Sequence, residues 1–274
     1  MDGKRRKIML ALALTFIGIA AVGMATKNQT LSSKAVLTTE HVAVPDYTGR
    51  KVQAVAAQEV DGTYMNDLKQ RSLELFNSIK GTAYREWTDE LVKETTNGRF
   101  QTEQAWTAYM QEGYQKVEKD RASRETAQKV LEEILLDTRL IQYGKEDYTE
   151  AEKGIMEQTI YGSGYLSEKD YLDDCGITNQ ELKENLKEDV LKSLKCQYVI
   201  EAIAEKEKLV PAEAEMEKYR QEHMQGLTEM GYGEDDIYYQ EELQHYMEEE
   251  PQYRRNVMTE HVLDFLYENS AING

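Results

Sequence analysis

The longest unbroken run of helical periodicity in the chain covers 179–209. Apolar side chains recur along it at four-residue steps, at Leu182, Leu186, Val190, Leu194 and Tyr198. This spacing places them on one stripe of an α-helix. At about 1.5 Å per residue, the segment makes a rod of roughly 46 Å. A rod of this length needs other helices packed against its apolar stripe, so the pattern predicts a mainly helical fold.

Capping signals mark both ends of this predicted helix. Thr178 stands at the N-cap position with Glu181 three residues on, which is the spacing of a capping box. Gly176 ends a short amphipathic segment just before it, as a residue suited to the left-handed conformation that often closes a helix. Pro211 is the first strong helix breaker after the run. The segment is therefore predicted to be one helix from end to end.

Similar periodicity predicts the other helices of the chain. They cover 60–79, a short segment capped by Thr88, a long run capped by Thr102, and then 146–160, 211–226 and 237–249, with a last helix opened by Pro251. The middle of the long run, 118–125, is almost wholly charged. It is either a solvated part of one helix or a bend between two helices.

The first part of the chain follows a different pattern. The uncharged apolar run 8–25 follows four basic residues, Lys4, Arg5, Arg6 and Lys7. We interpret 1–26 as a transmembrane anchor or signal sequence, with the N-terminus in the cytoplasm and the bulk of the chain outside; the alternative is secretion after signal cleavage. Residues 27–40 are predicted to be a linker. Short β segments at 42–44 and 52–55 predict a small β/α segment over 41–83.

Composition supports a folded, helix-rich protein with an acidic surface. The chain is 40% hydrophobic and 31% charged, and it has only 17 Gly and 3 Pro, which favours long helices over a turn-rich β fold. Its formal net charge is −18, so its surface repels nucleic acid, and we exclude that class of partner. The 18 Tyr and 11 Met are typical of apolar surfaces that are partly wet and must adapt.

No set of residues in the sequence predicts catalysis or metal binding. Cys175 and Cys196 are too far apart along the predicted helices for a disulfide, so we expect two separate thiols. The 4 His residues do not form HxxxH, and there is no CxxC. We find no Ser/His/Asp or Cys/His set with a supporting local motif. The expectation is a protein without cofactor, metal or enzymatic activity.

The order of motifs in the second half resembles a known family. Leu166 and Tyr171-Leu172 precede the Gly176-Ile177-Thr178 turn, followed by the 199–205 segment, a Pro-opened helix and the final 262–269 segment. This order resembles the C-terminal domain of trigger factor, a bacterial chaperone, over 84–270. Residues 41–57 resemble a strand of that family's N-terminal domain. The resemblance implies an elongated multi-helix chaperone domain over 84–274, similar also to the helical arms of periplasmic parvulin-type chaperones.

Two features of trigger factor are missing from this sequence. The FKBP-type prolyl isomerase domain should stand before Trp87, but one predicted helix fills that interval, and such a domain needs on the order of 100 residues to form a core. The basic ribosome-docking motif is also missing. We therefore expect neither prolyl isomerisation nor ribosome binding, although the family name suggests the first.

The function predicted from these features is that of an extracytoplasmic, ATP-independent holdase for unfolded or newly exported polypeptides, tethered to the cytoplasmic membrane through 8–25. Its clients would bind a helical cradle lined by Tyr and Met. The candidate lining residues are Tyr161, Tyr165, Met224, Leu227, Met230, Tyr232, Tyr238, Tyr239, Tyr246 and Met247. For each of them, ordinary helix packing is the alternative. The alternative function is a membrane-tethered scaffold for one dedicated envelope partner.

Overall fold

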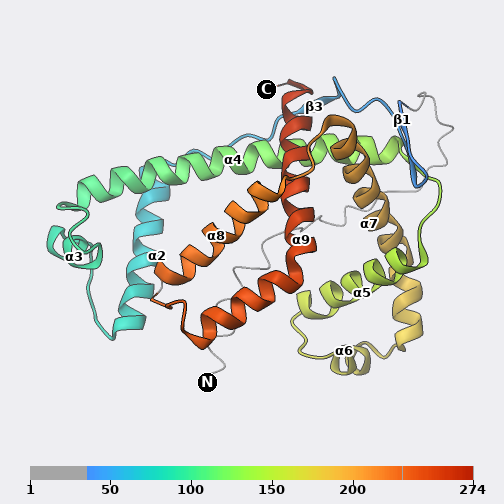
Figure 1. Ribbon diagram of the computed structural model, residues 1–274. Helices are drawn as coiled ribbons and strands as arrows, with labels where there is room; N and C mark the ends of the chain where they lie inside the picture. The colour runs from blue at the N-terminus through green and yellow to red at the C-terminus, as the bar shows by residue number, and fades with distance from the viewer. Residues whose placement is uncertain (1–35, 230, 274) are drawn as a thin grey trace. The chain divides into compact units, whose positions relative to one another are not determined.

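The computed structural model describes residues 36–229 and 231–273, which fall within one compact unit (Figure 1). The described part is mainly helical, as the periodicity predicts. Its helices are α2 (Gly62–Lys80), α3 (Asp89–Thr95), α4 (Glu103–Asp137), α5 (Lys145–Gly162), α6 (Glu168–Cys175), α7 (Asn179–Glu207), α8 (Glu213–Glu229) and α9 (Ile237–Glu268). Its strands are β1 (Leu37–Thr38), β2 (Val42–Val44), β3 (Lys51–Gln53), β4 (Arg139–Leu140) and β5 (Ala271–Asn273).

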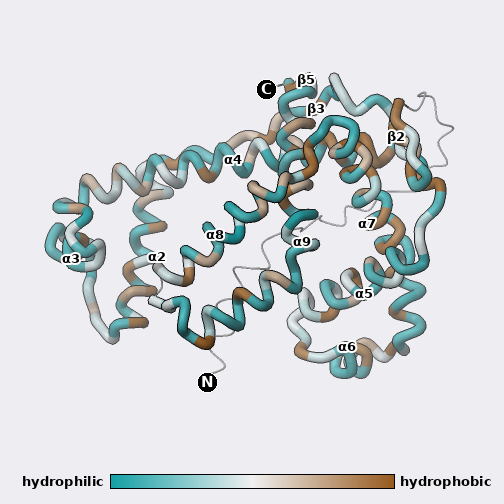
Figure 2. The backbone as a smooth tube through the Cα atoms, in the orientation of Figure 1, coloured by the Kyte–Doolittle hydropathy of each residue, from teal (hydrophilic) through white to brown (hydrophobic). Residues whose placement is uncertain are grey.

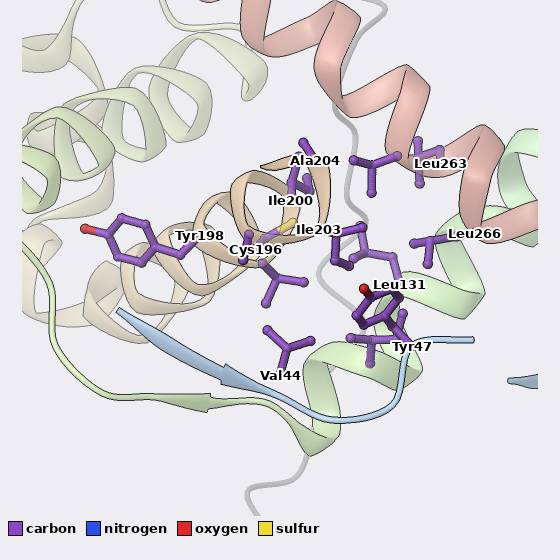
Figure 3. Packing of buried hydrophobic residues seen from close by; sticks show 14 of the residues in the cluster. Val44, Tyr47, Leu131, Cys196, Tyr198, Ile200, Ile203, Ala204, Leu263 and Leu266 are labelled. Carbon is purple, nitrogen blue, oxygen red and sulfur yellow. The ribbon is translucent and has the colours of Figure 1, made fainter. Parts of the chain in front are cut away.

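The main core forms where α4, α7, the C-terminal half of α9 and β2 meet. Figure 3 shows Leu131 of α4, Ile203 of α7 and Leu266 of α9 converging near Val44 of β2. Val44, Ile203 and Leu266 are each 0% exposed. The predicted stripe of α7 is confirmed, because Leu182, Val190, Leu194 and Tyr198 are buried and Leu186 is half-buried against a small core. The capping box of Thr178 and Glu181 is also present.

Two small sheets connect distant parts of the chain. β2 lies between β1 and β4, and both neighbours are antiparallel to it. β3 pairs in parallel with β5, with Lys51 opposite Ala271. The two predicted β segments are therefore strands, but they do not pair with each other. β1 falls within the stretch that the sequence predicts as a linker, and the C-terminal residues are fixed to the N-terminal part of the described chain.

The charged stretch 118–125 is part of one continuous helix, α4, so the alternative of a bend is wrong. Arg121 bridges Glu118 and Glu125 at 2.9 and 2.5 Å, three and four residues away along the helix. Side chains of α4 also bind the extended chain before α2. Gln111 Nε2 donates to the carbonyl of Val60 at 2.7 Å, and the N–H of Val60 donates to Gln115 Oε1 at 3.1 Å.

The last two predicted helices are one helix in the structure. Pro251 lies inside α9 rather than at the start of a new helix. Proline has no N–H and clashes with the preceding turn, so it bends a helix without always ending it. Figure 1 shows α9 changing direction along its length. Pro211 also differs slightly from expectation, because α8 begins two residues later, at Glu213.

The prediction of a transmembrane helix needs correction. Within residues 36–229 and 231–273, no helix is both long and apolar enough to cross a membrane. The longest of them, α4 and α9, carry charged side chains throughout, such as Arg121 and Arg254. The predicted span 8–25 lies outside the described residues. An N-terminal transmembrane helix, and with it a single-pass or signal-anchored location, is not supported. The fold class is mainly α with short strands.

Candidate functional site

Most of the predicted lining residues gather on one helical hairpin. We define the α8–α9 hairpin as residues 211–253, in which α8 packs against the N-terminal half of α9. Seven of the predicted residues lie on its described part: Met224, Leu227, Tyr232, Tyr238, Tyr239, Tyr246 and Met247. Met230 belongs to the same stretch of sequence but lies outside the described residues. Figure 2 shows that α8 is mostly hydrophilic along its length, with few apolar positions.

The interior of this hairpin consists of Met, Leu and Tyr. Met216, Met224, Leu227 and Tyr246 are between 2% and 5% exposed. Three of the predicted residues, Met224, Leu227 and Tyr246, are thus packing residues in this conformation, which was the alternative for each. They would contact another polypeptide only if the two helices moved apart. Methionine suits such a place, because its unbranched chain repacks easily.

An aromatic cluster holds the two helices together. Tyr246 stacks on Tyr253 with ring centroids 4.6 Å apart and planes at 11°. Two rings of α8 join this pair. The ring centroid of His223 lies 5.7 Å from that of Tyr246, and the ring centroid of Tyr219 lies 6.0 Å from that of Tyr253. Burial is the main cause that raises the pKa of Tyr246 and of Tyr253. The buried hydroxyl of Tyr246 has no hydrogen-bond partner among the described residues. The interior of the hairpin therefore leaves one buried polar group, the hydroxyl of Tyr246, unsatisfied by the described residues.

A second aromatic pair lies at the turn between the two helices. The rings of Tyr232 and Tyr238 are 4.7 Å apart. Gly231 adopts a φ of +95°, a conformation that favours glycine. Asp236 caps α9 by accepting a hydrogen bond from the N–H of Tyr238 at 2.8 Å. This turn thus presents two of the predicted lining residues, Tyr232 and Tyr238, as contacting, half-buried tyrosines.

The outer face of the hairpin exposes apolar side chains. Ile237 is 75% exposed and Met247 is 55% exposed. Their spacing places them on one stripe of α9, with Gln240 and Gln244 between them. We call Ile237, Gln240, Gln244 and Met247 the outer stripe. Ile237 was not among the predicted residues. Its signal in the sequence is an isolated isoleucine directly after the acidic turn 234–236.

The hairpin is strongly acidic. Lys218 and Arg220 are the only basic Lys or Arg residues between 211 and 250, a stretch that contains thirteen Asp and Glu. Arg220 pairs with Glu217 at 2.6 Å, and its Nη1 lies 3.7 Å from the sulfur of Met247. The exposed apolar side chains therefore stand in a negative field.

Two basic side chains of α9 hold the base of the hairpin. Arg254 donates to the carbonyl of Pro211 at 3.0 Å, to Glu213 at 2.7 Å and to Glu250 at 3.0 Å. His261 lies 2.8 Å from the carbonyl of Leu209 and 2.8 Å from Glu215. These contacts attach the chain between α7 and α8 to α9. The sequence analysis missed both residues, because their partners are distant in sequence.

Tyr161 and Tyr165 lie apart from the hairpin residues. Tyr161 lies in the last turn of α5, and Tyr165 follows this helix. Met156 and Ile160 of α5 form a separate small core with Leu182 of α7. Tyr165 packs against this core, with its ring 5.2 Å from that of Tyr171, and its hydroxyl donates to Asp174. Tyr161 is 54% exposed, and neighbouring Leu166 is 85% exposed. The ten predicted residues therefore do not form one continuous lining.

The cysteines do not form a reactive pair. Cys196 is buried in the main core, and burial raises the pKa of its thiol to about 12. A buried thiol of this kind is a poor nucleophile. Cys175 is exposed at the end of α6. In the described part of the chain, no group of three or more His, Cys, Asp or Glu residues could hold a metal ion.

Comparison with known proteins identifies a relationship for the second half of the chain. No curated protein matches the sequence. A family model does match: residues 149–268, less than half of the 274, fit the bacterial trigger factor protein C-terminus. The match begins in α5 and ends with α9, so it includes the whole α8–α9 hairpin and excludes α2 to α4. That region of trigger factor is its chaperone part rather than its isomerase domain, so residues 149–268 are similar to a chaperone domain.

Proposed function

We propose that this protein is an ATP-independent chaperone, a holdase that binds unfolded polypeptides at the α8–α9 hairpin. The observation that carries the proposal is the outer stripe, where Ile237 and Met247 are 75% and 55% exposed on a hairpin with a Met- and Tyr-rich interior. The match to the trigger factor C-terminus supports the same class of function.

The driving force for binding is burial of apolar surface on both sides. Each 100 Å² of apolar surface that is removed from water contributes about 2.5 kcal/mol before the costs of ordering. Unfolded chains expose many short apolar segments, and these differ in shape. Met216, Met224 and Tyr246 line an interior that can rearrange to accept different side chains. Repacking of this interior allows one surface to hold many clients.

A second exposed apolar site supports binding of extended clients. Leu166 and Tyr161, which are 85% and 54% exposed, lie at the α5–α6 turn, outside the hairpin. An extended polypeptide can contact several such sites, which raises its affinity through a high effective concentration. A scaffold for one folded partner instead requires a single well-packed patch of fixed shape. The distribution of apolar residues therefore favours the holdase over the scaffold.

Aggregation suppression tests the proposal. The full chain is added without ATP to a denatured reporter protein diluted into buffer, and a proline-limited refolding assay is run alongside. We expect less aggregation at near-stoichiometric protein and no acceleration of refolding. The double variant Ile237→Ser/Met247→Ser should lose most of the effect. The matched control Val117→Ser/Leu136→Ser changes side chains on α4 that are 57% and 50% exposed, and it should retain the effect.

Two outcomes would contradict the proposal. Unchanged aggregation in the presence of the wild-type chain would exclude a general holdase and would favour a single dedicated partner. Equal loss in the outer-stripe variant and in the α4 control would show that apolar surface anywhere on the protein suffices, and the hairpin would not be the site.

A further inference from the structure

The two arms of the α8–α9 hairpin both start at interruptions of regular helical hydrogen bonding. One arm is α8, which follows α7 after the connection 208–212. The other arm is the part of α9 before Pro251, 237–250. Proline has no N–H to donate to the preceding turn, so a helix bends more easily there. After Pro251, α9 is fixed in the main core through Val262 and Leu266. The arms can therefore pivot on a rigid support.

One side chain joins both arms to the fixed part of α9. Arg254 stands three residues after Pro251. It donates a hydrogen bond to Glu250 on one arm at 3.0 Å and to Glu213 on the other arm at 2.7 Å. It also donates to the carbonyl of Pro211, just before α8, at 3.0 Å. Because Arg254 bonds to both arms at once, it fixes the position of one arm relative to the other.

His261 reinforces this junction from the same face of α9. It lies seven residues, or about two helical turns, after Arg254. Its two ring nitrogens lie 2.8 Å from the carbonyl of Leu209 and 2.8 Å from a carboxylate oxygen of Glu215. The side chain of Glu213 is 88% exposed, so water can replace its contact with Arg254 when the arms separate. We call these two α9 side chains and their partners the clasp: Arg254, His261, Leu209, Pro211, Glu213, Glu215 and Glu250.

The clasp keeps the apolar interior of the hairpin away from clients. Met224 and Tyr246 are 5% and 2% exposed while the arms are together. The outer stripe presents two apolar side chains, Ile237 and Met247, in the closed hairpin. Separation of the arms adds the interior side chains to the surface that a client contacts. Since the free energy gained on binding rises with the apolar area removed from water, the open hairpin binds a client more tightly than the closed one.

We propose that the clasp autoinhibits the hairpin: the closed form is a low-affinity state, and clients bind tightly only after the clasp releases and the arms separate. This inference rests on the proposed function, because it concerns the regulation of the same client site. The apparent affinity of the protein is the affinity of the open form multiplied by the fraction of molecules that are open. Weakening the clasp therefore strengthens client binding, whereas removal of a client contact weakens it.

Client affinity and amide exchange, measured on the same full-length variants, test the inference. The probe is reduced, carboxamidomethylated lactalbumin, which stays unfolded, and fluorescence anisotropy gives its dissociation constant. In Arg254→Ala/His261→Ala, amide exchange in α8 should rise, and the dissociation constant should fall about threefold or more. Arg255→Ala is the matched control. This neighbouring arginine pairs with Glu150 of α5 and takes no part in the clasp, so its loss should change neither quantity.

A second variant, Glu213→Gln/Glu215→Gln, weakens the clasp from α8 and should act in the same direction. Helical circular dichroism confirms that each variant is folded. Faster exchange in α8 without tighter client binding would overturn the inference and leave the proposed function intact. Unchanged exchange in α8 of both clasp variants would also overturn it, because the clasp would not hold the arms. Absence of client binding by the wild type and by every variant would contradict the proposed function, and the inference with it.

Discussion

The main core and the α8–α9 hairpin bury apolar side chains in different ways. In the core, aliphatic residues from α4, α7, α9 and β2 meet, and Val190, Leu194 and Ile203 are 0% exposed. In the hairpin, two helices that are neighbours in sequence pack through Met224, Tyr246 and a few others. At its base, the hairpin is attached to the rest of α9 by contacts of Arg254 and His261.

This difference separates a rigid support from an adaptable surface. Branched aliphatic residues fit one arrangement well, and many long-range contacts hold them in it. Methionine and tyrosine fit several arrangements, and a pair of helices opens at lower cost than the core of a domain. The hairpin even contains a buried hydroxyl, that of Tyr246, for which the described part of the chain offers no hydrogen-bond partner. We infer that stability resides in the core and client binding in the hairpin.

The largest expected effect comes from a cavity in the core. Leu194→Ala removes a fully buried side chain of α7, which should lower the free energy of unfolding by about 2–5 kcal/mol in urea titrations. Met224→Ala, which truncates a residue in the hairpin, should instead raise amide exchange mainly in α8 and the first half of α9. Equal losses of global stability in both variants would show that hairpin and core unfold as one unit.

The next effect concerns the base of the hairpin. Arg254→Ala removes three hydrogen bonds to Pro211, Glu213 and Glu250, so the hairpin should open more readily by about 1–2 kcal/mol. Amide exchange in α8 measures this opening. The control Arg121→Ala removes two ion pairs on the exposed side of α4, where the loss of stability should be small because water screens both pairs. Unchanged amide exchange in α8 of the Arg254→Ala variant would mean that contacts other than those of Arg254 hold the base of the hairpin.

A stabilising change is expected inside the hairpin. Tyr246→Phe removes the buried hydroxyl, which has no hydrogen-bond partner within 36–229 and 231–273, and keeps the ring that stacks on Tyr253. Since an unsatisfied buried polar group costs about 1–3 kcal/mol, the variant should slow exchange in the hairpin and raise the melting temperature slightly. Tyr219→Phe changes a 38% exposed ring of the same cluster and should be close to neutral. A destabilised Tyr246→Phe protein would indicate a hidden partner for the hydroxyl.

The smallest effect concerns a carboxylate at the edge of the core. Burial raises the pKa of Glu201 on α7, although Gln197 donates a hydrogen bond to it at 2.9 Å. The folded protein thus holds this proton more tightly than the unfolded chain, so stability falls as pH rises from the ordinary glutamate value through the raised one. Glu201→Gln should therefore stabilise the protein at about pH 7, by less than about 1 kcal/mol, and the gain should vanish at about pH 4.

Glu205→Gln, at an exposed position of the same helix, is the control and should change stability little at either pH. A Glu201→Gln variant that is less stable than the wild type at neutral pH would show that the carboxylate has a favourable charged partner. Arg255, which lowers the pKa of Glu201 through its charge, is the residue to examine in that case.

The helices could be predicted well from local signals. Thr88, Thr102 and Thr178 cap the helices as their spacing indicates, and Gly176 adopts the left-handed conformation. These signals depend on residues three or four positions apart, which the sequence shows directly. Pro251 led to a wrong prediction, because a proline locally indicates the end of a helix. In the structure α9 continues through Pro251 as one helix.

The faces of the helices were harder to predict than their positions. Leu75 and Ile79 have the spacing of a packed stripe, yet both are exposed in the structure. Helix α2 buries Met65 and Leu73 instead. Likewise, Met224 and Tyr246 looked like lining residues and are interior ones. Which stripe of a helix is covered depends on partners that are distant in sequence, such as the pairing of β3 with β5, and no local pattern encodes these.

Hydrogen exchange in the presence of an unfolded client tests the central claim most directly. Amide exchange of the full chain is followed by mass spectrometry with and without a permanently unfolded polypeptide. We predict slower exchange in 213–250 on addition of the client, with little change in the α7 segment that contains Leu194 and Ile203. Unchanged exchange throughout the hairpin, with protection confined to other segments, would contradict the assignment of client binding to the α8–α9 hairpin.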